Sequence, residues 1–394
     1  MYVIRSNPWR TAFFVIVAIN LAYGVPKVIH KMQSIKESHT VISRCSVKGE
    51  AYLDLIIKAN RAMLRRQNGM TVVCETPWDA YLVAVGPMTY YQVTHDHGVL
   101  ADIEKHIDTL IDKNGDFKKP VTFVDQCAIG AVLCDLYETT KKERYKTAAG
   151  HLASYLCSQM NEGQIPYRHS FPEYMLIDTL GMTCEFLTHF ANLTKRHDYA
   201  DVATTQLIDF FENGIDDKTN LAFHAYRVGE VGGSGVLGWC RGEGWMLLGL
   251  VGTLEHLDKQ HPAYPRLRSM LSESVSALER YQEPEGCWKW AVNVEGARID
   301  TSGSAMVAFA IQRAIVAGVL DRKWERVTKK ALSGLMAFTS RDGVLMGALK
   351  DVNWVGDYPQ VYTTSVRSQG PAVGLAALLM RSESIERQPK HTLP

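Results

Sequence analysis

Several common signatures of metal, redox and nucleic-acid chemistry are missing from this 394-residue sequence. It has no CxxC pair, no HExxH motif and no histidine next to a cysteine, so a zinc site has little support in the sequence. The 43 Lys and Arg residues balance 42 Asp and Glu residues, which gives a net charge of +1. A nucleic-acid partner usually requires a clearly basic face, and we therefore expect none.

Low-complexity tracts and charged tails are also absent. Hydrophobic residues make up 46% of the chain and charged residues 22%, which is typical of an ordinary folded protein. We expect one folded domain over residues 40–385 and a polar tail over 386–394. An anionic ligand would have to be bound by a few local cations.

The N-terminus carries the longest apolar run, TAFFVIVAINLAYG (11–24), after Arg5 and Arg10 and before Lys27. A core of about 14 residues suits a signal peptide better than a membrane span of about 20 residues. Residues 1–30 are therefore predicted to be a signal peptide or, alternatively, an uncleaved anchor that associates with a membrane through residues 11–26. Either alternative predicts a secreted or membrane-anchored protein with its folded domain outside the cytoplasm.

The eight cysteines favour buried thiols over a disulfide framework. Five of them lie in apolar helical patterns, namely Cys127, Cys134, Cys157, Cys184 and Cys240. If any pair forms a disulfide, Cys45 and Cys74 are the best placed.

An internal repeat indicates the architecture. Four segments each contain an apolar helix, a polar turn with an aromatic residue, and a second helix, and the unit recurs roughly every 60 residues. The aromatic residues are Tyr145, Tyr199, Tyr264 and Trp324. Helices with apolar spacings of three and four bury one stripe each, so a single hairpin cannot be stable alone. The pattern predicts an all-α protein of about six hairpins closed into an (α/α)6 barrel; an open solenoid is the alternative.

The loops before the first helix of each repeat carry the candidate functional residues. Asp125 and Asp178 lie one repeat apart and would face the same axial pocket of a closed ring. Asp before an apolar helix is often only a cap, which is the preferred interpretation of Asp300. Asp178 follows Tyr174-Met175-Leu176-Ile177, and an acid among such neighbours suits general acid catalysis.

The segment WCRGEGW (239–245) places an arginine between two indole rings. Trp239, Arg241 and Trp245 would suit a sugar that carries a carboxylate, whereas a core Trp pair with a solvated Arg is the simpler alternative. His169 and His224 are further binding candidates, although single histidines are more often structural.

Four motifs in order resemble glycoside hydrolase family 105, the unsaturated rhamnogalacturonyl hydrolases, and more distantly the unsaturated glucuronyl hydrolases of family 88. They are LIDTLGM (176–182), WCRGEGW, DTSGSAMVAFAI (300–311) and SQGPAVGLAALL (368–379). The resemblance implies an (α/α)6 barrel that removes a Δ4,5-unsaturated uronic acid from the non-reducing end of an oligosaccharide. It also implies that Asp178 is the general acid and base, Asp125 a second pocket carboxylate, and His224, Trp239, Arg241 and Trp245 substrate-binding residues.

The chain departs from the family pattern at four positions. Gly181 stands where the family has Phe, Cys240 where it has Ala, Glu243 where it has Asn, and Asp300 where it has Glu. We expect the extra carboxylate of Glu243, so close in sequence to Arg241, to weaken the attraction for an anionic sugar.

The predicted reaction is acid-catalysed hydration of the C4=C5 double bond, with no metal or organic cofactor. Asp178 would protonate C4, and Asp125 would keep Asp178 protonated and orient the sugar. An inverting glycosidase that uses both carboxyls on a saturated sugar is the main alternative. A noncatalytic glycan-binding protein is a second alternative. A terpene cyclase is a third, supported only by the single match of QEPEGCW (282–288) to the pattern Q-x3-G-x-W, without the acid motif of such enzymes.

Overall fold

The computed structural model describes residues 49–65, 78–352 and 354–387. The predicted targeting segment, Cys45, Cys74 and all but two residues of the predicted tail lie outside these ranges. Twelve α-helices, two short 3₁₀ helices and five short strands make up the described chain. None of its helices is both long enough and apolar enough to cross a membrane.

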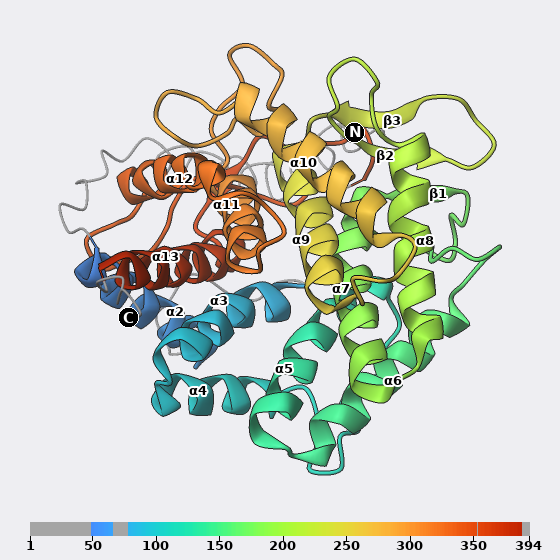
Figure 1. The fold of residues 1–394 in the computed structure, drawn as a ribbon, viewed down its shortest axis with the longest axis horizontal. Coiled ribbons are helices and arrows are strands. Elements are labelled where there is room, and N and C mark those ends of the chain that lie inside the picture. Colours follow the sequence, from blue (N-terminus) through green and yellow to red (C-terminus); the bar gives the residue numbers. More distant parts are fainter. Residues whose placement is uncertain (1–48, 66–77, 353, 388–394) are drawn as a thin grey trace, which may run out of the picture.

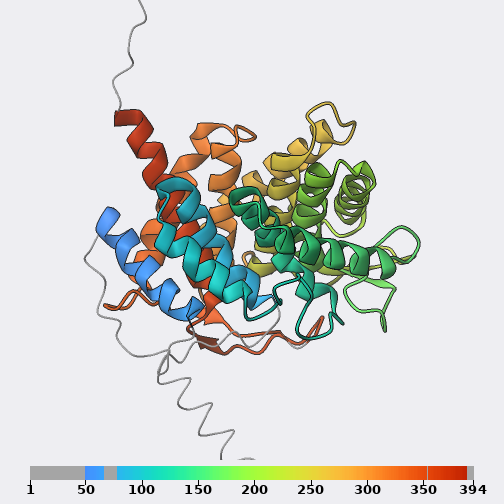
Figure 2. The same ribbon diagram turned by 90° about the horizontal axis from the view of Figure 1, so that it is seen from below.

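Six helices contact one another in a closed inner ring (Figures 1 and 2), in which each helix touches the next and the last returns to the first. In ring order they are α3 (Asp79–Thr94), α5 (Gly130–Thr140), α7 (Ile177–Thr194), α9 (Cys240–His256), α11 (Thr301–Val316) and α13 (Val366–Arg387). The prediction of a helical toroid is thus confirmed, because an open solenoid would lack the contact between α13 and α3.

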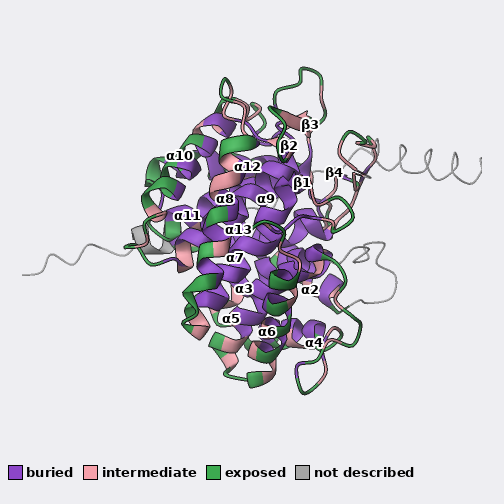
Figure 3. Ribbon diagram, turned by 90° about the vertical axis from the view of Figure 1, so that its right-hand side faces the viewer, coloured by how far each residue is buried: buried purple, intermediate pink, exposed green. Residues whose placement is uncertain are grey.

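Each inner helix packs against at least one outer helix. The outer helices are α2 (Glu50–Leu64), α4 (His97–Ile107), α6 (Glu143–Ser158), α8 (His197–Asn213), α10 (Tyr264–Arg280) and α12 (Glu325–Ala337). Figure 3 shows the reason for the two layers: α7 and α9 are buried almost throughout, whereas α10 keeps an exposed stripe. A helix that is apolar on all sides must lie inside, and an amphipathic helix can cover it.

The repeated aromatic residues lie where four of the outer helices begin. Tyr145, Tyr199 and Trp324 are buried and Tyr264 is partly buried. Two 3₁₀ helices, η1 (Val124–Ile129) and η2 (Arg322–Trp324), precede α5 and α12. The repeat therefore marks the turn between an inner helix and its outer partner.

Short strands were not predicted, and they position the site. β1 (Tyr174–Leu176), β2 (Phe223–Arg227) and β3 (Gly233–Leu237) form an antiparallel sheet, and β4 (Ala348–Leu349) pairs with β5 (Tyr362–Thr363). Leu176 of β1 pairs with Ala225 of β2, which brings the first turn of α7 beside His224. The register of this sheet joins two segments that the sequence alone leaves apart.

Close packing of α7 against α9 depends on glycine. A Cβ atom at Gly181 would lie 2.4 Å from the carbonyl oxygen of Trp245, and one at Gly249 would lie 2.4 Å from that of Leu180. The absence of the family's Phe at position 181 thus has a structural reason, because α9 occupies that space.

The cysteine prediction holds for four of the five helical thiols, which are buried. Cys157 is exposed, so its predicted burial is wrong. It lies near the end of α6, an outer helix that buries only one face.

Candidate active site

A pocket of about 170 Å³ opens at the end of the toroid where α7 and α9 begin. Its lining combines aromatic rings with charged groups: Trp78, Tyr167, Arg168, Leu176, Asp178, His224, Trp239, Arg241, Trp245, Asp351, Val352 and Trp354. Of the predicted site residues, five line this pocket. The sequence motifs that carried the prediction therefore converge in space.

Asp178 lies in the first turn of α7, inside the helix rather than at its cap. Its side chain is 11% exposed, and Oδ2 lies 3.3 Å from Nε2 of His224. The two groups are close enough for an ion pair, but the N–H direction is too poor for a hydrogen bond. Oδ2 has no hydrogen-bond partner among the described residues. It remains available to a substrate or a water molecule.

Tyr358 orients the histidine. Its hydroxyl lies 2.7 Å from Nδ1 of His224 and accepts the backbone N–H of Val236 at 3.0 Å. Because the hydroxyl oxygen already accepts one hydrogen bond, its own proton can be donated to Nδ1, and in that tautomer the ring hydrogen is on Nε2. In that tautomer the Nε2–H lies beside Asp178 but is not aligned with Oδ2.

Asp125 lies in η1 and does not line the pocket. Its Oδ2 accepts hydrogen bonds from Nη2 of Arg168 at 2.8 Å and from the Tyr167 hydroxyl at 3.3 Å. Burial raises the pKa of Asp125, although the positive charge of Arg168 opposes the effect. Asp125 therefore reaches the pocket through Arg168 and Tyr167, and no direct contact with Asp178 is seen.

Arg241 lines the pocket and is almost completely buried. Its guanidinium donates to the carbonyl oxygens of Leu349 and Lys350, at 2.7 and 3.2 Å, and to the hydroxyl of Ser302. Burial lowers its pKa, and the nearby charge of Arg367 adds to the effect. The alternative of a solvated arginine is wrong, because strand β4 holds this side chain in place.

The Trp239 indole lies between Arg241 and His224. The guanidinium carbon is 5.0 Å from the Trp239 ring centre, and the His224 ring centre is 4.5 Å from it. The buried indole N–H finds no acceptor in the described part of the chain. A buried donor in a pocket wall is suited to bind a substrate oxygen.

Glu243 does not enter the pocket, so the expected repulsion of an anionic sugar is not supported. One oxygen of Glu243 accepts the backbone N–H of Ala222 at 2.8 Å, and the residue is fully buried. Burial raises its pKa to about 8. At neutral pH the carboxyl is mostly protonated, and it ties α9 to the segment that leads into β2.

The remaining candidate residues, Asp300 and His169, do not line the pocket. Asp300 caps α11 by accepting the N–H groups of Ser302 and Gly303, as predicted. His169 is exposed and does not line the pocket, whereas its neighbour Arg168 does.

Sequence reasoning missed Trp78, Tyr167, Arg168, Asp351, Trp354 and Tyr358. Arg168 and Tyr167 belong to the same PYRHS segment as His169, so the sequence predicts the right segment but the wrong side chain. Tyr358 and Trp354 come from a loop that has no motif to mark it.

The N-termini of three inner helices also favour the binding of an anion in the pocket. Inner helices α3, α7 and α9 all direct their N-terminal ends to this side, where Trp78, Asp178, Trp239 and Arg241 lie. Helix N-termini carry a partial positive charge. Together with two arginines, they give this aromatic-lined pocket a positive field that suits an anionic ligand.

A helical toroid with such a pocket defines the chain as a carbohydrate-active enzyme. A model of Glycosyl Hydrolase Family 88 matches residues 55–388, and the chain belongs to this family. The sequence prediction of a glycoside hydrolase is confirmed.

Similar proteins agree with this assignment. An unsaturated rhamnogalacturonyl hydrolase, YesR of Bacillus subtilis, is 23% identical over 76% of this chain and 88% of its own length. A structure from Salmonella enterica, described as a possible member of family 105, has a TM-score of 0.76 at 20% identity, over 86% of this chain and 96% of its own. A family 105 glycoside hydrolase of C. acetobutylicum has a TM-score of 0.73 at 23% identity, over 84% and 99%.

Proposed function

We propose that this protein is an unsaturated uronyl hydrolase, which removes a Δ4,5-unsaturated uronic acid from the non-reducing end of an oligosaccharide. The observation that carries the proposal is the position of Asp178, a buried acid beside His224 in a pocket of aromatic rings and arginines. The name of the Bacillus subtilis relative supports the same class of reaction.

In this reaction Asp178 gives its proton to C4 of the sugar, and the electron pair of the C4=C5 bond forms the new C4–H bond. The cation left at C5 is stabilised by the ring oxygen. Water adds to C5 and loses a proton to the Asp178 carboxylate, which restores the acid. One carboxyl thus serves as both acid and base.

The hydrated sugar is a hemiketal at C5. Cleavage between C5 and the ring oxygen gives a ketone at C5 and a hemiacetal at C1, and collapse of the hemiacetal releases the aglycone as an alcohol. No group attacks C1, so the reaction does not require the second carboxyl that ordinary glycosidases place across the anomeric carbon.

The pocket residues then have distinct tasks. Arg241 and Arg168 attract the sugar carboxylate, His224 orients the attacking water beside Asp178, and Trp239 and Trp245 flank the ring. Asp125 acts through Arg168, because it holds the guanidinium in place. Because Asp125 does not line the pocket and its Oδ2 is bound by Arg168 and Tyr167, its task is to orient the sugar through Arg168.

A panel of oligosaccharides tests the proposal. Fragments of lyase-treated pectin, glycosaminoglycan and ulvan carry the double bond, whose ultraviolet absorbance disappears on hydration. We expect the absorbance of at least one fragment to fall with release of a new reducing end. Cleavage of the saturated counterparts alone would instead establish the inverting glycosidase, and tight binding without turnover would establish a noncatalytic protein.

We also propose that residues 1–30 export the protein, either as a cleaved signal peptide or as an anchor through residues 11–26. The apolar run with flanking cations supports this. Expression of the full chain, followed by fractionation and N-terminal sequencing, distinguishes the two, and a protein that stays in the cytoplasm contradicts both.

A further inference from the structure

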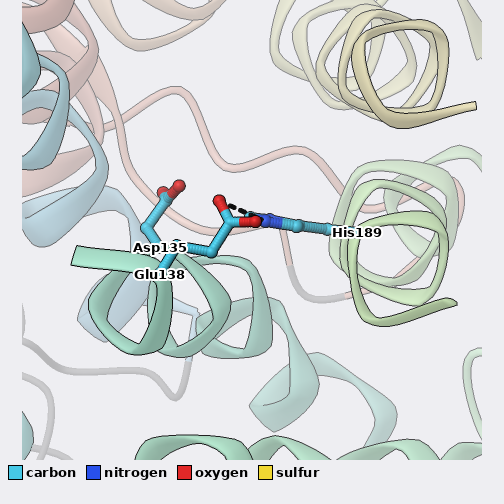
Figure 4. A group of neighbouring side chains, drawn as sticks. All are labelled: Asp135, Glu138 and His189. Carbon is cyan, nitrogen blue, oxygen red and sulfur yellow. Dashed lines mark ion pairs between the residues drawn. The ribbon is translucent and has the colours of Figure 1, made fainter. Parts of the chain in front are cut away.

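Three side chains of types that can bind metals come together between α5 and the C-terminal half of α7 (Figure 4), whereas the pocket lies where α7 begins. Asp135 and Glu138 are three positions apart on α5 and project from one face, and His189 of α7 points toward them. One donor atom from each residue lies within 4.8 Å of the other two. None of the three lines the pocket.

The spacing of these atoms fits a bound ion. Nε2 of His189 and Oε2 of Glu138 are 3.3 Å apart. A tetrahedral zinc ion with bonds of about 2.0–2.1 Å holds neighbouring donor atoms about 3.4 Å apart. The His189–Glu138 distance is thus compatible with one edge of such a coordination shell, and a donor atom of Asp135 lies within 4.8 Å of both.

His189 gives a second, independent indication. The residue is only 1% exposed, and its Nε2 makes no well-aligned hydrogen bond in the described ranges, its contact with Glu138 at 3.3 Å being an ion pair. The ring of His256 stacks on it, with ring centres 3.8 Å apart and planes 9° apart. This stacking fixes the imidazole plane, so a buried nitrogen is held facing two carboxylates.

The charges around the cluster leave room for a cation. Arg313 is engaged by Glu185 at 2.8 Å and by Glu255. Within the described chain, neither Asp135 nor Glu138 forms an ion pair with Lys or Arg. The C-terminal ends of α5 and α7 add partial negative charge. A divalent ion would offset the negative charge of Asp135, Glu138 and the two helix ends.

We infer that Asp135, Glu138 and His189 form a binding site for a divalent transition-metal ion, with zinc as the best match. Imidazole with carboxylate ligands favours such ions over magnesium and calcium, which prefer oxygen alone. The Glu138 side chain is 48% exposed and offers an entry route. His189 lies about 16 Å along the α7 axis from Asp178, so the ion clamps α5 to α7 and takes no part in sugar chemistry.

The test uses the full chain without a histidine tag, freed of metal by a chelator and assayed at pH 7.5. Titration calorimetry with zinc chloride is expected to show one tight site. Zinc at about a hundred times its dissociation constant is expected to raise the Tm by about 4 °C. Magnesium at the same concentration is expected to leave the Tm unchanged.

Substitutions locate the site. Glu138→Gln and Asp135→Asn each remove a ligand and are expected to weaken zinc binding at least about tenfold. Asp217→Asn, an exposed acid in the loop after α8, is the matched control and keeps the parent affinity. The inference fails if zinc leaves the Tm of the parent unchanged, or if Glu138→Gln and Asp135→Asn bind zinc as tightly as the control. Because the readouts are binding and stability, either result is independent of the proposed hydrolysis.

Discussion

Nε2 of His224 lies 3.3 Å from Oδ2 of Asp178, although the two residues come from different repeats. The pairing of β1 with β2 creates this relationship, because it lays the start of α7 beside the strand that carries His224. Tyr358 then binds the other ring nitrogen. The acid is thus flanked by an oriented imidazole, and the chemistry of the pocket depends on this chain of three side chains.

Replacement of Asp178 by Asn is expected to remove the proton donor while preserving the shape of the pocket. General acid catalysis typically contributes about 10²- to 10⁴-fold, so kcat should fall by that factor and KM should change little. The rate of loss of double-bond absorbance measures both constants. Asp217→Asn is the control, and an Asp178→Asn enzyme with the parent kcat would refute the assignment.

Tyr358→Phe tests the orientation of His224. Without the hydroxyl, Nδ1 loses its partner and the hydrogen is no longer confined to Nε2, so we expect kcat to fall about 10- to 100-fold. KM and Tm should stay near the parent values, which separates positioning from loss of structure. Tyr362→Phe is the matched control, since that hydroxyl binds Gln360 instead. Equal kcat values for the two variants would contradict the role of Tyr358.

Recognition of the sugar carboxylate is tested at Arg168. Arg168→Gln is expected to raise KM for an unsaturated uronide about tenfold, because a charged hydrogen bond and the support of Asp125 are both lost. The methyl ester of the same substrate carries no charge and should show a much smaller change. The ratio of kcat/KM for acid and ester measures the effect, and an unchanged ratio would show that Arg168 does not meet the carboxylate.

The sequence predicted the toroid and the main pocket residues because both follow from helical periodicity and short motifs. Arg241 and Trp245 are four positions apart on α9 and both line the pocket. Glu243 lies two positions from Arg241, which is about 200° around the helix. Proximity in sequence therefore misled the prediction, since the side chain points into the core.

The missed residues belong to irregular segments. From the loop between β4 and β5, Trp354 reaches the pocket and Tyr358 reaches His224 behind it, and the path of this loop is set by tertiary contacts rather than by local pattern. Tyr358 is fixed by its bonds to His224 and Val236, both far away in sequence. Irregular loops have no periodic apolar pattern, so the positions of these side chains could not be predicted from the sequence.

The buried carboxyl of Glu243 should make stability depend on pH. Its pKa in the folded protein is about 8, well above its ordinary value. A raised pKa means that the folded chain holds the proton more tightly than the unfolded chain. The contribution of Glu243 to the free energy of unfolding is therefore greatest below about pH 4.5 and is lost as the pH rises toward 8. Glu243→Gln keeps a neutral acceptor for Ala222 and cannot ionise.

The comparison of parent and Glu243→Gln isolates this effect, because all other groups are shared. Between pH 5 and pH 9, we expect the free energy of unfolding of the parent to decrease by roughly 2–5 kcal/mol relative to that of Glu243→Gln. Denaturant unfolding at the two pH values measures the difference. A gap that stays constant with pH would mean that Glu243 is already ionised in the folded chain.

Gly181 and Gly150 should respond in opposite directions to alanine. At Gly181 a Cβ would lie 2.4 Å from the Trp245 carbonyl oxygen, so Gly181→Ala forces α7 and α9 apart and is expected to cost about 1–3 kcal/mol. At Gly150 of α6 the nearest atom to a Cβ is 3.7 Å away, in ordinary contact. Gly150→Ala should stabilise the protein by about 0.5–1 kcal/mol through helix propensity.

The same pair of variants links this packing to the site. Displacement of Trp245 from the pocket wall should raise KM in Gly181→Ala, whereas Gly150→Ala should keep the parent KM. Thermal unfolding and the absorbance assay give the two readouts. If Gly181→Ala were as stable and as active as Gly150→Ala, close approach of α9 would not be the reason for glycine at position 181.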